Sequence, residues 1–194
     1  MNPFLSVWLH PKQTARYVIE QKSLLYVITI TILGYIAAGF SGLRDSALYP
    51  NFSYVWIFLI SIILVPIIGF IFTLITTGIV FIVGKLLNGT GSFWDVFKAY
   101  SLTSIPAIYT GPFYILALFV DEVNAITIIL SIIIFVTSVW SMVILVAAVA
   151  EAHQFSIIRS IITLIIPAII LFIFLFGLLA IIMLLFAVVL DSMP

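Results

Sequence analysis

Two short polar segments hold most of the groups in this chain that could carry chemistry. The first is GKLLNGTGSFWDVFKAYSLTSIP, residues 84–106, and the second is AEAHQFSIIRS, residues 150–160. Ser92 and Asp95 fit the capping-box pattern, in which a hydroxyl accepts from a backbone amide in the first turn of a helix. Two glycines precede them, so a lipid phosphate at these amides is the alternative to plain capping. No lysine follows at the spacing of a nucleotide-binding loop.

The two segments together offer a weak metal-ligand set. Asp95, Glu151 and His153 together would supply two carboxylates and one imidazole to a divalent ion. Two residues apart on a helix, Glu151 and His153 point to different faces. We therefore predict no metal and no cofactor. We expect instead that a helix beginning near Phe93 packs against the second segment, so that Asp95 or Glu151 pairs with His153 or Arg159.

The composition excludes most soluble and catalytic classes. Of the 194 residues 65% are hydrophobic and 7% are charged, whereas a soluble domain carries about 25% charged residues. A chain this small cannot hide so much apolar surface from water, so lipid must be its solvent. Seven basic and seven acidic residues cancel, which argues against nucleic acid, because a phosphate backbone needs a cationic face. With no cysteine, nucleophile–base pair or cofactor fingerprint, we predict that the chain is not an enzyme.

Five apolar blocks must position these polar segments. Continuous apolar runs of this length predict transmembrane helices and exclude the alternating pattern of a β-barrel. We predict an all-α integral membrane protein, a five-span helical bundle forming one domain over residues 1–194. Its parts are an N-terminal tail at 1–23 and spans at about 24–40, 54–83, 101–120, 123–150 and 157–190.

The tail is predicted to form a short helix in the membrane interface. Pro11 suits the first position of that helix, and Trp8 and Tyr17 suit the headgroup level. The alternative is that the tail is only the frayed start of the first span.

Two of the spans contain residues that disturb helices. The second block is about 30 residues long, more than the roughly 20 that a span requires, and Pro66 with Gly69 predicts a kink in it. The third is interrupted by Pro106 and by Gly111-Pro112, which is similar to the broken helix of a transporter. No Asp, Glu, Lys or Arg lies in the middle of a span, which argues against ion-coupled transport. Serine and threonine inside the spans predict packing between helices, with the lining of a pore as the alternative.

The basic residues predict the orientation. Six of them lie on one side, in the tail and in the two polar segments: Lys12, Arg16, Lys22, Lys85, Lys98 and Arg159. The other side has one basic residue and four acidic ones: Arg44, Asp45, Asp121, Glu122 and Asp191. By the positive-inside rule the N-terminus is cytoplasmic and the C-terminus is outside.

Three motifs, in order along the chain, give a family resemblance. The opening NPFLSVWLHPKQTARYVIE resembles the N-P-W-x-S-x-W-x-x-P-x-x-x-x-R start of bacterial proteins of the Yip (Ypt-interacting protein) domain family, with Phe4 in place of tryptophan. The middle GTGSFWDVFKAYSLTSIP and the turn AEAHQFSIIRS are similar to the family's second and third motifs. Eukaryotic relatives are multispanning proteins of secretory membranes, associated with small GTPases and trafficking. This chain lacks their long acidic tail, so GTPase binding is not carried over.

The resemblance maps the family's polar positions onto one set of residues. With Pro106 set apart, these form a predicted cytoplasmic polar cluster: Asp95, Lys98, Tyr100, Glu151, His153, Ser156 and Arg159. We predict a membrane-organising or trafficking-type scaffold in a bacterial cell membrane. Its expected partners are membrane lipids and a membrane or cytosolic protein, and a homo-oligomer stays open. The alternative function is a small-solute, ion or lipid transporter or channel that uses the broken third span.

Overall fold

The computed structural model describes residues 1–40, 54–117 and 125–191, and every regular element in those ranges is a helix. In chain order these are α1 (Pro3–Ser6), α2 (Pro11–Gln21), α3 (Leu24–Gly39), α4 (Tyr54–Leu59), a π-helical turn (Ile60–Leu64), α5 (Val65–Leu86), α6 (Phe93–Ser101), α7 (Ser104–Ala117), α8 (Ala125–His153) and α9 (Ile157–Asp191). The predicted helical class is confirmed. Arg44, Asp45, Asp121 and Glu122 lie outside the described residues.

The N-terminal tail forms a helix of its own. Pro11 opens α2 as expected, because a proline at the first helical position loses no hydrogen bond. The backbone turns to an extended conformation at Lys22, and the Ser23 hydroxyl then caps α3 by accepting from the Tyr26 amide at 3.3 Å. The tail is therefore not a frayed start of the first span.

The long second block contains its irregularity close to the predicted place. Residues Ile60–Leu64 form a π-helical turn, which closes with a hydrogen bond from the Val65 amide to the Ile60 carbonyl. Pro66 follows at once, and proline has no N–H to return to the preceding turn. Gly69 allows α3 to approach α5 closely, because the Tyr35 ring occupies the space that a side chain at position 69 would need.

The predicted break in the third span is wrong. Helix α7 runs without interruption from Ser104 through Pro112 to Ala117, and Pro106 sits in its first turn, where a missing amide costs little. The chain breaks before the prolines, between the end of α6 and Ser104. Gly111 brings α7 close to α3, with Ala37 Cβ 3.0 Å from the position that a glycine side chain would occupy.

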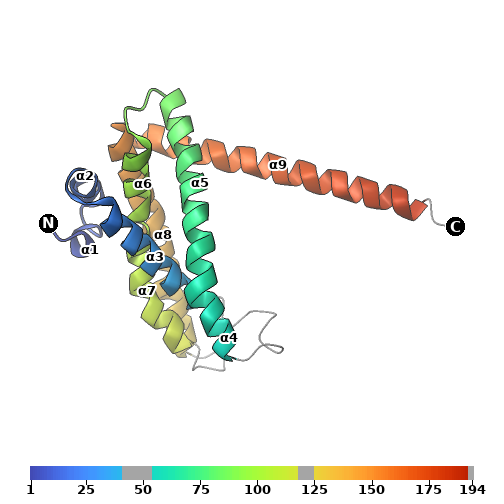
Figure 1. The fold of residues 1–194 in the computed structure, drawn as a ribbon, viewed down its shortest axis with the longest axis horizontal. Helices are drawn as coiled ribbons and strands as arrows, with labels where there is room; N and C mark the ends of the chain where they lie inside the picture. The colour runs from blue at the N-terminus through green and yellow to red at the C-terminus, as the bar shows by residue number, and fades with distance from the viewer. Residues whose placement is uncertain (41–53, 118–124, 192–194) are drawn as a thin grey trace.

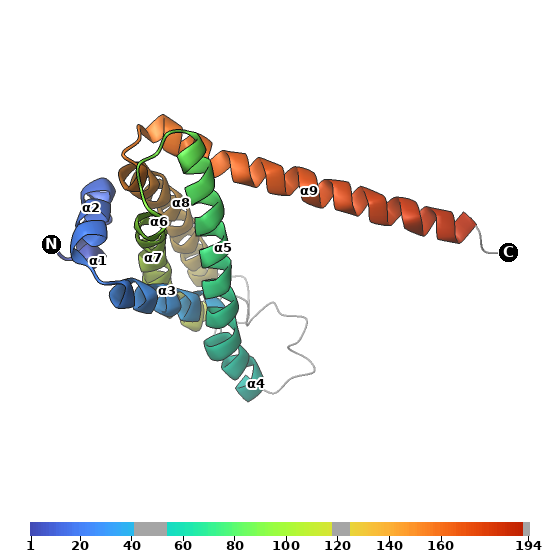
Figure 2. The same cartoon turned by 45° about the horizontal axis from the view of Figure 1, so that its top comes forward.

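The helices form a bundle from which α9 departs. Helix α6 packs against both α5 and α8, α3 packs against α5 and α7, and α2 lies across α8 and α6. The core at these contacts includes Phe97, Leu102, Ile105 and Ile144, all fully buried. Helix α9 contacts α8 and α5 at its start and then projects away from the bundle (Figures 1 and 2).

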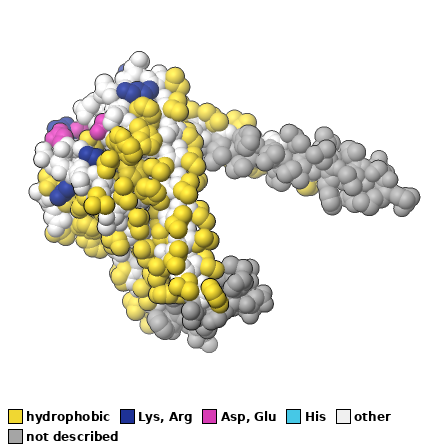
Figure 3. All heavy atoms as spheres, in the orientation of Figure 1, with side chains coloured by type: hydrophobic (Ala, Val, Ile, Leu, Met, Phe, Trp, Pro, Cys, Tyr) yellow, Lys and Arg dark blue, Asp and Glu magenta, His cyan; other side chains and the backbone are white. Residues whose placement is uncertain are grey.

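Apolar and charged side chains are segregated along the bundle. Among the described residues, Ile62–Leu86 and Ala125–His153 are long and apolar enough to cross a membrane. On α5 a row of isoleucines at helical spacing is exposed: Ile67, Ile71, Ile75, Ile79 and Ile82. Figure 3 shows charged side chains gathered at one end of the molecule, around α2, α6 and the nearby end of α5, with hydrophobic side chains along the described part of the bundle below them. This is the surface expected of a membrane protein, whose apolar flank faces lipid.

Candidate functional site

The charged end is built around one buried carboxylate. Glu151, in the last turn of α8, is 2% exposed, and its Oε1 accepts a hydrogen bond from Arg16 Nε of α2 at 2.5 Å. Lys12 Nζ, one turn earlier on α2, lies 3.8 Å from the other carboxylate oxygen. The hydrogen bond and charge of Glu151 raise the pKa of Arg16 above its usual value. Two cations of the N-terminal helix thus neutralise an almost fully buried carboxylate.

Helix α2 is placed for this contact by its apolar face. Ala15 and Val18 are buried in the hydrophobic core, and α2 packs against α8 and α6. At its other end, Lys98 Nζ of α6 donates to the Ile19 carbonyl at 2.6 Å. The last carbonyls of a helix lack partners within it, and a cation there satisfies one and complements the helix dipole.

The capping box predicted at Ser92 and Asp95 is confirmed. The Ser92 hydroxyl accepts from the Asp95 amide at 3.2 Å, and Asp95 Oδ2 accepts from the Ser92 amide at 2.9 Å. The box starts α6 directly after the loop that touches the end of α8: the Thr90 amide donates to the His153 carbonyl at 3.2 Å. Helix α6 packs against α8 itself, and the loop before it contacts the last turn of α8.

His153 is buried in a cradle of glycines. It is 1% exposed, and neither ring nitrogen has a hydrogen-bond partner within the described parts of the chain. The ring occupies the places where side chains at Gly84 and Gly89 would stand, and the Ala152 carbonyl does the same at Gly91. Phe155 stacks on the ring with centroids 5.1 Å apart. Burial first, and the charge of Lys85 second, hold the pKa of His153 below its usual 6.5, against the opposing effect of Asp95.

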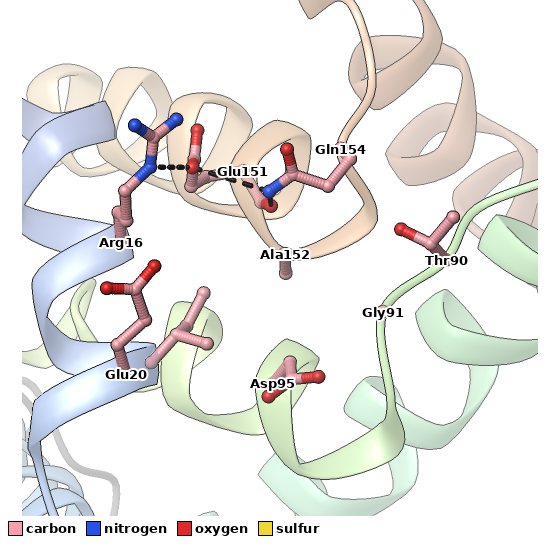
Figure 4. A pocket seen from close by; sticks show the side chains of 9 residues that line it. Arg16, Glu20, Thr90, Gly91, Asp95, Glu151, Ala152 and Gln154 are labelled. Carbon is pink, nitrogen blue, oxygen red and sulfur yellow. Dashed lines mark hydrogen bonds and ion pairs between the residues drawn. The ribbon is translucent and has the colours of Figure 1, made fainter.

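A polar recess lies between α2, the loop before α6 and the end of α8. Its volume is about 210 Å³. Its lining residues are Arg16, Ile19, Glu20, Thr90, Gly91, Asp95, Glu151, Ala152 and Gln154. Figure 4 shows Glu20 and Asp95 on one side of it and the Arg16–Glu151 pair on the other. Gln154 Nε2 donates to the Glu151 carbonyl at 2.7 Å and borders the pair.

The expected charge pairs within the predicted cluster are wrong. Glu151 pairs with α2, Asp95 is engaged by Ser92, and the ring of His153 meets neither carboxylate. Glu151 and Arg16 are 135 positions apart, so their pairing depends on how α2 docks, which local pattern does not specify. The described part of the chain holds no group of three or more His, Asp or Glu residues that could bind a metal.

The other residues of the predicted polar cluster lie at the edge of the core or at the start of α9. Tyr100 is partly buried beside the core. Ser156 Oγ accepts from the Arg159 amide at 3.4 Å at the start of α9, and the Arg159 side chain is exposed. Sequence reasoning missed Lys12 and Arg16 as site residues, although their spacing of one helical turn puts both on one face of α2.

The family model of the Yip1 domain matches residues 5–179. This covers most of the chain, and the protein belongs to the Yip1 domain family. It is thus a helical membrane protein of a trafficking-related family. Comparison with curated proteins and with solved structures gave no match.

Proposed function

We propose that this chain is a non-enzymatic polytopic scaffold that organises the membrane, with its charged end in the cytoplasm. The observation that carries the proposal is the burial of Glu151 under Arg16 and Lys12. These charged residues hold the N-terminal helix on the bundle, and they do not line a pathway for ions or solutes through it. A rigid cytoplasmic end on an apolar bundle suits a protein that shapes lipid or holds a partner.

The hydroxyl groups inside the helices support a packed interior. Several of the buried and half-buried ones donate to a carbonyl four residues earlier in their own helix, as in Thr31, Thr73, Thr110, Thr137 and Ser141. A hydroxyl satisfied in this way needs no water. Thr77 differs, since its buried hydroxyl has no partner among the described residues. This pattern favours packing between helices over a wet pathway.

The proposal includes a topology and a location. The chain crosses a bacterial cell membrane five times, with α2 at the cytoplasmic interface and the C-terminus outside. The six basic residues of the tail and the two polar segments support this orientation. Its partners are membrane lipids and a membrane or cytosolic protein.

Reconstitution separates the scaffold from a transporter. The protein is placed in vesicles of phosphatidylethanolamine and phosphatidylglycerol that contain a trapped dye, and vesicle shape is followed by electron cryo-microscopy. We expect changed vesicle shape with the dye and ions retained. Arg16→Ala, which frees α2, should lose the effect, and Gln13→Ala, an exposed change on the same helix, should keep it. Flux of ions or small solutes with unchanged vesicle shape would overturn the proposal.

A further inference from the structure

The neutral, enclosed imidazole of His153 has no role in the scaffold as proposed, and its surroundings indicate one. A buried polar group without hydrogen bonds is costly, and native proteins keep few such groups. Both ring nitrogens of His153 are in this state. The ring closes a contact between three parts of the chain: the end of α5 at Gly84, the loop at Gly89 and the last turn of α8.

We propose that His153 is a proton-sensitive latch that holds the loop between α5 and α6 on the end of α8. In the closed state the Thr90 amide and hydroxyl both donate to the His153 carbonyl, at 3.2 and 3.3 Å. Lys85 Nζ donates to the Thr90 carbonyl at 3.2 Å and ties the same loop to α5. Thr90 and Gly91 are also a wall of the polar recess. Release of the loop therefore opens the recess.

The charges around the ring determine the direction of the switch. Lys85 of α5 opposes a positive ring and Asp95 of α6 favours it. On its own helix, Glu151 is already bound by Arg16 of α2. The loop at 87–92 has no ionisable side chain, and Arg159, in the first turn of α9, is a further cation. A protonated His153 ring would thus have no described group to accept a hydrogen bond from either N–H, and it would be repelled by the charge of Lys85.

The linkage follows from these groups. In the closed state the pKa of His153 lies below 6.5, and in an open, hydrated state it returns to about 6.5. The closed state is therefore fully favoured above about pH 6.5 and loses stability as the pH falls towards the closed-state pKa. Acid opens the latch.

The chain is suited to a direct test because it has two histidines, and His10 is exposed. The full-length protein, with ring-labelled histidine, is titrated in lipid nanodiscs from about pH 7.5 to about pH 5, a window around the usual histidine pKa. Both ring signals are followed by NMR. Hydrogen exchange of residues 84–92 is measured over the same range, corrected for the intrinsic pH dependence. We expect exchange in 84–92 to rise as His153 becomes protonated.

Charge variants distinguish a latch from a merely structural residue. Lys85→Gln should raise the pKa of His153 in the closed state and so move the opening midpoint to lower pH, and Lys85→Arg should leave the midpoint unchanged. Asp95→Asn should lower that pKa and move the midpoint to higher pH. His153→Gln should remain closed across the range. The proposal is wrong if exchange in 84–92 does not change while His153 titrates. It is also wrong if Lys85→Gln and Asp95→Asn have the same opening midpoint as the unchanged protein. An unchanged acid opening in His153→Gln would also overturn it.

Discussion

Glu151 and Arg16 form the contact on which the charged end depends, and the two residues are not equivalent. Glu151 is 2% exposed, whereas the Arg16 side chain is 60% exposed. Removing the cation leaves a buried carboxylate with only the more distant Lys12, but removing the carboxylate returns Arg16 to water. Breaking a buried pair from one side is costly, while replacing both members is often close to neutral.

This asymmetry gives a prediction for a double-mutant cycle. Arg16→Ala should lower the melting temperature of the detergent-solubilised protein more than Glu151→Gln does. The double variant should resemble Glu151→Gln alone, because no unpaired buried charge is left. Gln13→Ala is the control on the exposed face of α2. Additive effects of the two changes would contradict a direct coupling.

At the start of α6, Ser92 tests the capping box. Ser92→Ala removes the acceptor for the Asp95 amide and should cost about 0.5–2 kcal/mol of stability, while Ser92→Asp should preserve it. Denaturant unfolding in mild detergent measures both. Equal losses in the two variants would argue that the serine has a specific contact beyond capping.

The glycine cradle makes a sharper prediction at Gly84. A methyl group there overlaps the His153 ring, so Gly84→Ala should separate α5 from α8 and lower the melting temperature strongly. Gly177 is a matched control in α9, because no atom lies within 4 Å of its added methyl. Gly177→Ala should be neutral or stabilising by up to about 1 kcal/mol, the helix-propensity difference. Similar melting temperatures for the two variants would contradict the packing of the cradle.

At the scale of elements, the docking of α2 is the feature with most consequence. Ala15 is fully buried where this helix meets α8 and α6. Ala15→Leu should overpack the contact and cost about 1–3 kcal/mol, and limited proteolysis should then cut between α2 and α3. Gln13→Leu adds similar volume at an exposed position. Equal protease resistance in the two variants would place α2 off the bundle.

Local signals in the sequence predicted local structure well. The box of Ser92 and Asp95 and the proline that opens α2 each depend on residues within one helical turn, and both are confirmed. The π-helical turn lies close to Pro66, the residue whose missing amide predicted an irregularity in this block. Pro106 was misleading because a proline in the first turn of a helix costs no hydrogen bond. Pro112 lies inside α7, and the helix continues through it.

Long-range contacts could not be predicted in the same way. The importance of Glu151 and His153 was visible in a polar turn after an apolar run. Their partners depended on two docking events, α2 onto α8 and the Gly84–Gly91 segment onto the His153 ring. When a glycine makes room for a side chain from a distant part of the sequence, the residues next to it in the sequence show no pattern that predicts this contact.

At the scale of the whole molecule, the central claim is that the charged end is one cytoplasmic structure on a five-span bundle. The chain has no cysteine, so single cysteines can be placed at Gln13, at Leu86 and after Pro194 and tested with a membrane-impermeant maleimide. We predict that the first two are labelled only after the cells are permeabilised, and that the cysteine after Pro194 is labelled in intact cells. Labelling at Gln13 or Leu86 in intact cells, or protection of the cysteine after Pro194, would contradict the account.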